Sequence, residues 1–219
     1  PELSVSDAGI FETFDNSEFD GHRIGCFKTN STIESGNVCK TEISDGYAAK
    51  LTPQSTTVLM SASMDFLDSD AFCLDFMINK LSASTYAGIY LTSGTSKHPL
   101  MTFENGYLLL PNGESTDITV GSFEQITLHC ETANGKLGLT VNNHTIQSNI
   151  SPVSSADELV FSVRDGGNDG GVILDNILCF PAQCIRMTTE TKTPEFEKYE
   201  KCLLNEDFNS CNTNLPDGF

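Results

Sequence analysis

The sequence predicts an all-β protein, a two-sheet antiparallel β-sandwich of jelly-roll type. From residue 45 to residue 180 it consists of short apolar or alternating runs separated by turn residues, without sustained 3.6-residue periodicity. Asn-Gly pairs beginning at Asn105, Asn112 and Asn134 lie between runs and favour tight hairpins, because both residues accept positive φ. So many short strands fit two packed sheets better than one open sheet, whose second face would stay wet.

Each expected strand is a run of strand length that ends at turn residues. In chain order, the expected strands are Gly46–Leu51, Thr57–Phe66, Phe72–Lys80, Tyr86–Thr92, Leu100–Phe103, Tyr107–Pro111, Gln125–Glu131, Leu137–Val141, Glu158–Arg164 and Val172–Phe180. The three Asn-Gly pairs make their flanking strands antiparallel neighbours. The strands together predict a sandwich module over residues 1–183.

The chain changes character after Phe180. Residues 188–201 are rich in Thr, Glu and Lys, which predicts a disulfide-tethered linker over 184–203, with a short helix from Pro194 as an option. Glu12 and Glu206 are each followed by a phenylalanine two positions later. Residues 204–219 are therefore interpreted as the start of a further repeat or as an assembly tail, with a chance echo as the alternative. Because residue 1 is proline, we expect a mature product or a part of a longer protein.

The charge balance restricts the partners that we expect. Twelve basic and 30 acidic side chains give a net charge of −18, which argues against nucleic acid and anionic membranes. No apolar run approaches the roughly 18 residues of a membrane span. We therefore expect no membrane insertion.

The cysteines and sequons point to the secretory route. None of the eight cysteines belongs to paired C-x-x-C zinc knuckles, so disulfides are the preferred interpretation, with free buried thiols in an intracellular protein as the alternative. Eight cysteines allow 105 connectivities. Proximity in sequence suggests Cys26–Cys39 and Cys202–Cys211, and Cys73–Cys130 and Cys179–Cys184 would then form the other two pairs. Sequons at Asn30, Asn143 and Asn149 predict glycosylation and a secreted or cell-surface protein.

Two segments carry a family resemblance. Residues 125–143 resemble the strand, tight turn and strand of concanavalin-A-like and laminin-G-like sandwiches. Residues 158–180 are similar to the closing strands of that superfamily, with Asp175-Asn176 at a characteristic acidic step. The ends resemble MAM domains and jelly-roll adhesin modules. The chain differs from these families in having no tryptophan.

The resemblance implies a structural calcium ion between the opening and closing strands. Glu12 and Asp175 are the expected ligands, with Asp15 and Asp65 as additions, because calcium prefers several carboxylate and carbonyl oxygens. The alternative is that these side chains are ordinary carboxylates at strand ends.

Catalysis finds little support in the sequence. None of the four histidines lies in a recognised nucleophile motif, and the dense alternating carboxylates of laminarinase-like hydrolases are missing. Tyr86, Tyr90 and Tyr107 lie on neighbouring expected strands and could line a face that stacks on sugars, although strand aromatics also commonly cover a core.

The sequence thus predicts a non-catalytic extracellular adhesion or structural glycoprotein module. It would associate with other extracellular proteins or with copies of itself, as one unit of a repeated or fibrous protein. The alternative is a calcium-dependent, lectin-like carbohydrate-binding module. A sandwich-fold polysaccharide enzyme is a third hypothesis.

Overall fold

The computed structural model describes residues 9–32, 37–54, 56–67, 70–142, 144–164 and 170–181. Within these ranges the regular elements are all β-strands, as the sequence predicts. The strands are β1 (Ile10–Glu12), β2 (Phe19–Asp20), β3 (Arg23–Ile24), β4 (Phe27–Thr29), β5 (Val38–Ile43), β6 (Gly46–Leu51), β7 (Val58–Ser63), β8 (Ala71–Lys80), β9 (Tyr86–Ser93), β10 (Ser96–Glu104), β11 (Tyr107–Leu109), β12 (Ser115–Asp117), β13 (Phe123–Glu131), β14 (Lys136–Val141), β15 (His144–Asn149), β16 (Glu158–Arg164) and β17 (Val172–Pro181). The described part of the chain contains no helix long and apolar enough to cross a membrane.

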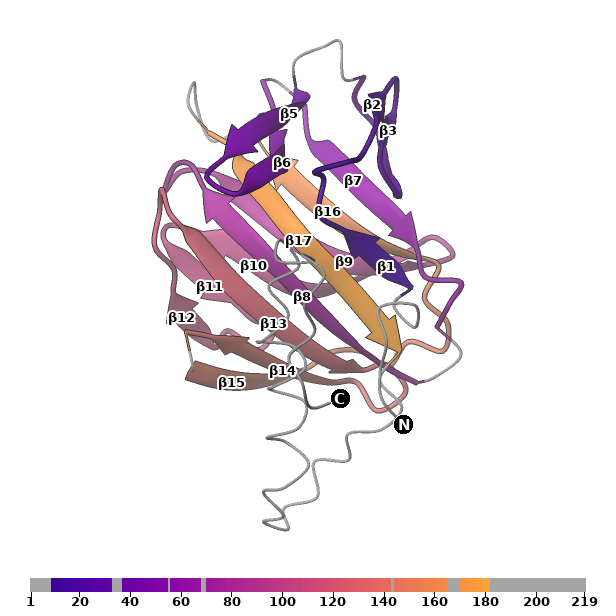
Figure 1. Cartoon of the computed structure of the whole chain (residues 1–219). Coiled ribbons are helices and arrows are strands. Elements are labelled where there is room, and N and C mark those ends of the chain that lie inside the picture. Colours follow the sequence, from indigo (N-terminus) through magenta and orange to yellow (C-terminus); the bar gives the residue numbers. More distant parts are fainter. Residues whose placement is uncertain are drawn as a thin grey trace, which may run out of the picture. The chain divides into compact units, whose positions relative to one another are not determined.

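The strands form two antiparallel sheets. One has the order β15-β14-β13-β8-β17-β6-β5, with β1 added beside β17, and the other has the order β12-β11-β10-β9-β16-β7-β4-β3-β2 (Figure 1). Alternate residues along the long strands are buried, as in Ile126, Leu128 and Cys130 of β13. This alternation directs one face of each sheet into a shared core, so the predicted two-sheet sandwich is confirmed.

Aromatic rings connect the two sheets. Phe161 of β16 lies edge-on to Phe76 of β8 at 5.5 Å between ring centroids, and edge-on to Phe27 of β4 at 6.0 Å. Phe76 belongs to the eight-stranded sheet, whereas Phe161 and Phe27 belong to the nine-stranded sheet. Edge-to-face rings at these separations are favourable because the positive ring edge meets the negative ring face. Phe161 is therefore a central contact of the core.

The Asn-Gly hairpins form where the sequence places them. Asn105 and Gly106 have φ of 51° and 80° and connect β10 to β11. Gly113 (φ 88°) lies in the turn between β11 and β12, and Gly135 (φ 64°) lies between β13 and β14. Positive φ at successive residues suits the twist of a tight hairpin.

Several strands escape prediction because they are short or polar. Strands β1 to β4 have two or three residues each, too few for an alternating pattern. β12 reads Ser-Thr-Asp and β15 reads His-Thr-Ile-Gln-Ser-Asn, and both lie at sheet edges where polar side chains face solvent. The expected strand Thr57–Phe66 ends early, at Ser63, because the amide of Leu67 turns back to the carbonyl of Met64.

The predicted disulfides Cys26–Cys39 and Cys73–Cys130 are wrong. Both pairs are free thiols, as is Cys179. For Cys73 and Cys130 the register gives the reason: Cys73 faces His129, and Cys130 faces Phe72. Successive residues of a strand point to opposite faces, so the two sulfurs lie on opposite sides of the sheet.

The remaining predictions about the C-terminal part lie outside the described residues. They comprise Cys184, Cys202 and Cys211, the linker over 184–203 with its optional helix, and the terminal segment 204–219.

Candidate functional site

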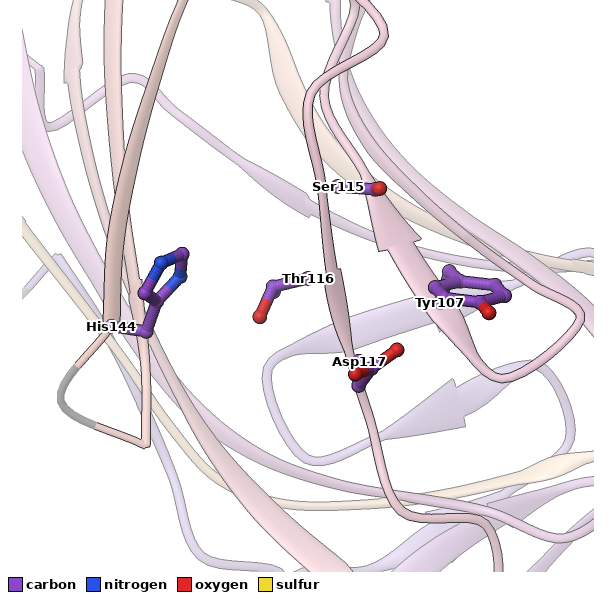
Figure 2. Close-up of a pocket in the computed structure, with 5 residues that line it drawn as sticks. All are labelled: Tyr107, Ser115, Thr116, Asp117 and His144. Atoms are coloured by element: carbon purple, nitrogen blue, oxygen red, sulfur yellow. The ribbon is translucent and has the colours of Figure 1, made fainter.

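A polar depression lies where edge strands of the two sheets come together. It has a cavity volume of about 330 Å³ and is lined by Tyr107, Ser115, Thr116, Asp117 and His144. Tyr107 comes from β11, the next three from β12, and His144 from β15 (Figure 2). The Tyr107 ring lies on the same side of β12 as Ser115 and Asp117, whereas Thr116 and the imidazole of His144 lie on the other side (Figure 2).

The β-ladder fixes the side chains on either side of β12. Tyr107 and Asp117 are paired residues of β11 and β12, so they stand next to each other on one face. The hydroxyl of Thr116 points across toward His144 in Figure 2. Tyr107 is 48 % exposed, and Asp117 and His144 are exposed as well. These groups are therefore available to a ligand from solution.

The turn between β11 and β12 is held against β15. Asn112 donates its backbone N–H to Ser148 Oγ (3.2 Å) and its side-chain amide to the carbonyl of Gln147 (3.1 Å). Gln147 donates its backbone N–H to Glu114 Oε2 (3.3 Å). These bonds connect the two sheet edges, which makes the depression a pre-formed feature of the fold.

Of the three predicted tyrosines, Tyr107 alone lines this depression. Tyr86 and Tyr90 are half-buried on β9, two strands away from β11. The guanidinium of Arg164 lies 3.7 Å from the ring centroid of Tyr86, and Lys97 Nζ lies 5.0 Å from that of Tyr90. Each of these rings already has a cation on one face.

The other residues that line the depression were not singled out from the sequence. One signal could have found Asp117: the Asn112-Gly113 turn predicts a hairpin whose returning strand places a residue opposite Tyr107. His144 comes from a separate hairpin on the other sheet, and no local pattern connects it with Tyr107.

An acidic cluster lies at the junction of β1, β6 and β17. There, the partner of β17 changes from β6, at Leu174 with Ala49, to β1, at Ile177 with Glu12 (Figure 1). A bulge separates the two pairings, and Asn176 within it has φ of 48°. The bulge places Asp175 beside the end of β1.

Glu12 organises the loops around this junction. Its Oε1 accepts hydrogen bonds from the amide of Phe14 (2.9 Å) and the hydroxyl of Ser17, and its Oε2 accepts one from the amide of Cys26 (3.1 Å). A Cβ on Gly25 would lie 1.7 Å from Oε2, so this close approach requires glycine. Asp15 Oδ1 accepts a hydrogen bond from the backbone N–H of Tyr47 (2.8 Å).

Asp175 is the most perturbed carboxylate of the cluster. It is 6 % exposed, and its Oδ1 has no hydrogen-bond partner. Burial raises the pKa of Asp175 from 3.8 to about 7, and the carboxylates of Asp45, Asp15 and Glu12 contribute to the rise. Two of the other predicted metal-site residues, Glu12 and Asp15, therefore lie near enough to Asp175 to act on its charge.

The cluster has the donor chemistry that suits calcium, with several carboxylates and one buried oxygen lacking a partner. Among the described residues, however, no three His, Cys, Asp or Glu side chains converge into a ready metal centre. Asp65 is exposed in the turn after β7, and it is not among the charges that act on Asp175.

Two predicted glycosylation sites can be placed. Asn30 and Asn149 are exposed. Asn30 Oδ1 accepts a hydrogen bond from the backbone N–H of Leu59 (2.7 Å), and Asn30 Nδ2 donates one to the carbonyl of Thr57 (2.9 Å). The side chain of Asn30 therefore also connects the end of β4 to β7. Asn149 lies on the edge strand β15. Asn143 lies outside the described residues.

A buried carboxylate on β8 also escaped prediction. Asp75 points away from the core, because its neighbours on the strand, Leu74 and Phe76, are buried core residues. It accepts hydrogen bonds from Gln125 Nε2 (3.1 Å) and Thr127 Oγ1 (3.3 Å), and burial raises its pKa. Thr127 and Leu178 are its partners on the neighbouring strands, so no carboxylate lies directly opposite it.

Known proteins resemble the chain in fold rather than in sequence. No family model matches it, and no curated protein has a significantly similar sequence. Its structure is similar to a sialidase, with a TM-score of 0.62 and 10% identity over 81% of this chain and 19% of the sialidase. The endo-1,3-β-glucanase from Streptomyces sioyaensis superposes with a TM-score of 0.55 and 10% identity, over 82% of this chain and 98% of that chain.

A third similar structure is the binding domain of botulinum neurotoxin DC in complex with SialylT. The TM-score is 0.52 with 11% identity, over 81% of this chain and 48% of that chain. The chain has the concanavalin-A-like sandwich fold. The predicted superfamily resemblance is thereby confirmed at the level of fold. The chain spans about a fifth of the sialidase and about half of the toxin domain.

Proposed function

We propose that this concanavalin-A-like module is a non-catalytic, extracellular glycan-binding module whose ligand stacks on Tyr107. The observation that carries the proposal is an exposed tyrosine ring on the same side of β12 as Asp117 and Ser115, in a depression that Thr116 and His144 also line. A sugar offers an apolar ring face for stacking and hydroxyls for polar side chains, and this depression offers both complements. The sialidase, the glucanase and the SialylT-bound toxin domain are consistent with this class of ligand.

One observation is consistent with a binding role without turnover. Burial raises the pKa of the Cys73 and Cys130 thiols to about 12, so they stay protonated at neutral pH and are poor nucleophiles. The exposed sequons at Asn30 and Asn149 support the extracellular placement, whereas the free thiols of the described cysteines agree with the intracellular alternative.

Replacing Tyr107 by alanine is expected to weaken glycan binding about tenfold or more, because burying one aromatic face contributes on the order of 1.5 kcal/mol. Tyr107→Phe keeps the aromatic ring and should therefore lose less glycan affinity than Tyr107→Ala. The measurement is binding of the labelled chain to a glycan array, followed by calorimetry on the ligands found. Glycans recovered after incubation with the protein should be uncleaved, because the proposed module binds without turnover.

Tyr47→Ala is the matched control, since Tyr47 is similarly exposed at 43 % but lies outside the depression. It should leave glycan affinity unchanged. Equal losses for the two variants, or no binding of any glycan, would contradict the proposal.

We also propose that the acidic cluster binds calcium. Asp175 would contribute its unpartnered Oδ1, with Glu12 and Asp15 as further ligands and Asp45 adding negative charge. The ion would neutralise the repulsion among these carboxylates and so fasten β1 to β17. The support is the concentration of acidic groups around one buried oxygen.

Calcium is expected to raise the melting temperature of the metal-free protein at pH 7.5 by about 5 °C or more at concentrations well above Kd. Asp175→Asn should lose most of this increase. Differential scanning calorimetry with calcium, magnesium or chelator tests the prediction. Identical melting curves with and without calcium would contradict it.

A further inference from the structure

The charges around the depression have one sign. Asp117 lines it, and Glu114 directly precedes Ser115 of β12. Glu114 is held at this edge by the amide of Gln147. None of the five lining residues is a lysine or an arginine.

The nearby strands carry their cations elsewhere. Arg164 stacks on Tyr86 of β9, and it belongs to β16, three strands from β11. At about 4.8 Å per strand it lies roughly 14 Å away, beyond a Debye length of about 8 Å at physiological salt. Lys97 and Lys136 lie at the ends of β10 and β14 remote from the depression. Lys80 is 1 % exposed and donates to the carbonyl of Ala83.

This arrangement favours hydroxyl donors over anions. A carboxylate only accepts hydrogen bonds, and its two oxygens can receive the hydroxyls on two adjacent carbons of a sugar. A sialic acid, uronic acid or sulfate group is itself an acceptor that needs cationic or N–H donors. Here it would meet Asp117 and Glu114 instead, so like-charge repulsion would oppose binding.

The size of the depression limits how much of a glycan it can hold. Its volume of about 330 Å³ is at the lower end of ligand sites, which span about 300 to 1,000 Å³. The terminal one or two rings of a glycan fit this range better than a long chain segment does.

We propose that the depression selects the uncharged end of a glycan, a hexose that presents two adjacent free hydroxyls to Asp117, and discriminates against sialylated, sulfated or uronic-acid ends. This inference rests on the proposed function, because it names the substrate class of the same site. The SialylT-bound toxin domain, similar in fold, provides a direct contrast in ligand charge.

The test uses matched pairs: a lactose-terminated oligosaccharide, and the same oligosaccharide capped with sialic acid or with sulfate. We expect the wild-type chain to bind the neutral member at least about tenfold more tightly at low salt. Added salt should narrow the difference, because it screens the repulsion. Asp117→Asn should weaken binding of the neutral member and also narrow the difference between the pair.

The remaining outcomes separate the two proposals. If a capped member binds as tightly as its neutral partner, and Tyr107→Ala reduces both, the charge selection is overturned while the glycan-binding function stands. If neither member binds and no other glycan does, the proposed function fails and the selection fails with it.

Discussion

Replacing Phe161 by alanine is expected to lower the free energy of unfolding by about 3 to 5 kcal/mol. Phe161 is 3 % exposed, and its ring meets Phe76 of the opposite sheet and Phe27 of its own sheet. Truncating Phe161 to alanine would remove the free energy gained by burying its ring and would remove both edge-to-face contacts. It would also leave a cavity between the sheets. Sheets are too constrained to collapse fully into such a space.

Denaturant unfolding of the wild type and of Phe161→Ala measures this difference. Phe161→Leu keeps much of the volume and should cost about 1.5 kcal/mol or less, which gives a second value if the alanine variant does not fold. Phe11→Ala is the control, because Phe11 is 40 % exposed and should cost less than about 1 kcal/mol. A loss below about 1 kcal/mol for Phe161→Ala would contradict the role of this contact.

The second large effect is a pH dependence that originates at Asp175. The pKa of Asp175 is raised from 3.8 to about 7 in the folded chain. The folded state therefore binds a proton more tightly than the unfolded state. This contribution to stability is complete below about pH 4 and is lost as the pH rises through about 7.

Part of the repulsion on Asp175 is screened, because Asp45 is exposed and Asp15 is half-buried. We therefore expect a loss of about 2 kcal/mol between pH 4 and pH 8 in the presence of a chelator. The quantity to measure is the difference in unfolding free energy between Asp175→Asn and the wild type across this range.

Asp175→Asn removes the titrating group. The unfolding free energy of the variant should therefore rise relative to that of the wild type as the pH increases, and the variant should be the more stable of the two above pH 7. Carboxylates remote from Asp175 titrate in both proteins and cancel in the difference, whereas Glu12, Asp15 and Asp45 interact with Asp175 and contribute to the difference. A difference that stays constant with pH would show that the Asp175 carboxyl titrates normally.

The strands that the sequence predicted correctly are the long ones of the sandwich. Glu158–Arg164 and Gly46–Leu51 match β16 and β6 at both ends. They could be predicted because apolar runs bounded by turn residues are a local property, and because Asn-Gly fixes positive φ without help from distant residues. β12 and β15 could not be predicted in this way, since edge strands need no apolar alternation.

The candidate sites divide in a similar way. The sequence supplied Tyr107 of the depression and Glu12, Asp15 and Asp175 of the acidic cluster. It did not supply Asp117 or His144, because the partners of Tyr107 depend on the β11–β12 pairing and on the approach of β15 from the other sheet. It also grouped Asp65 with the cluster, whereas Asp65 lies exposed in the turn after β7 and is not among the charges that act on Asp175.

By itself, the sequence determined the all-β class, three hairpins and a strongly negative charge, because periodicity, turn chemistry and composition are encoded in neighbouring residues or in simple sums. The tertiary structure decided which side of a sheet each residue faces, and with it the free thiols of Cys73 and Cys130. It also decided that β1 pairs with β17 at residues 177–179, just after Asp175, and that Tyr107 meets Asp117 near a sheet edge. These outcomes depend on strand register and sheet order, which are set by packing between residues far apart in the chain.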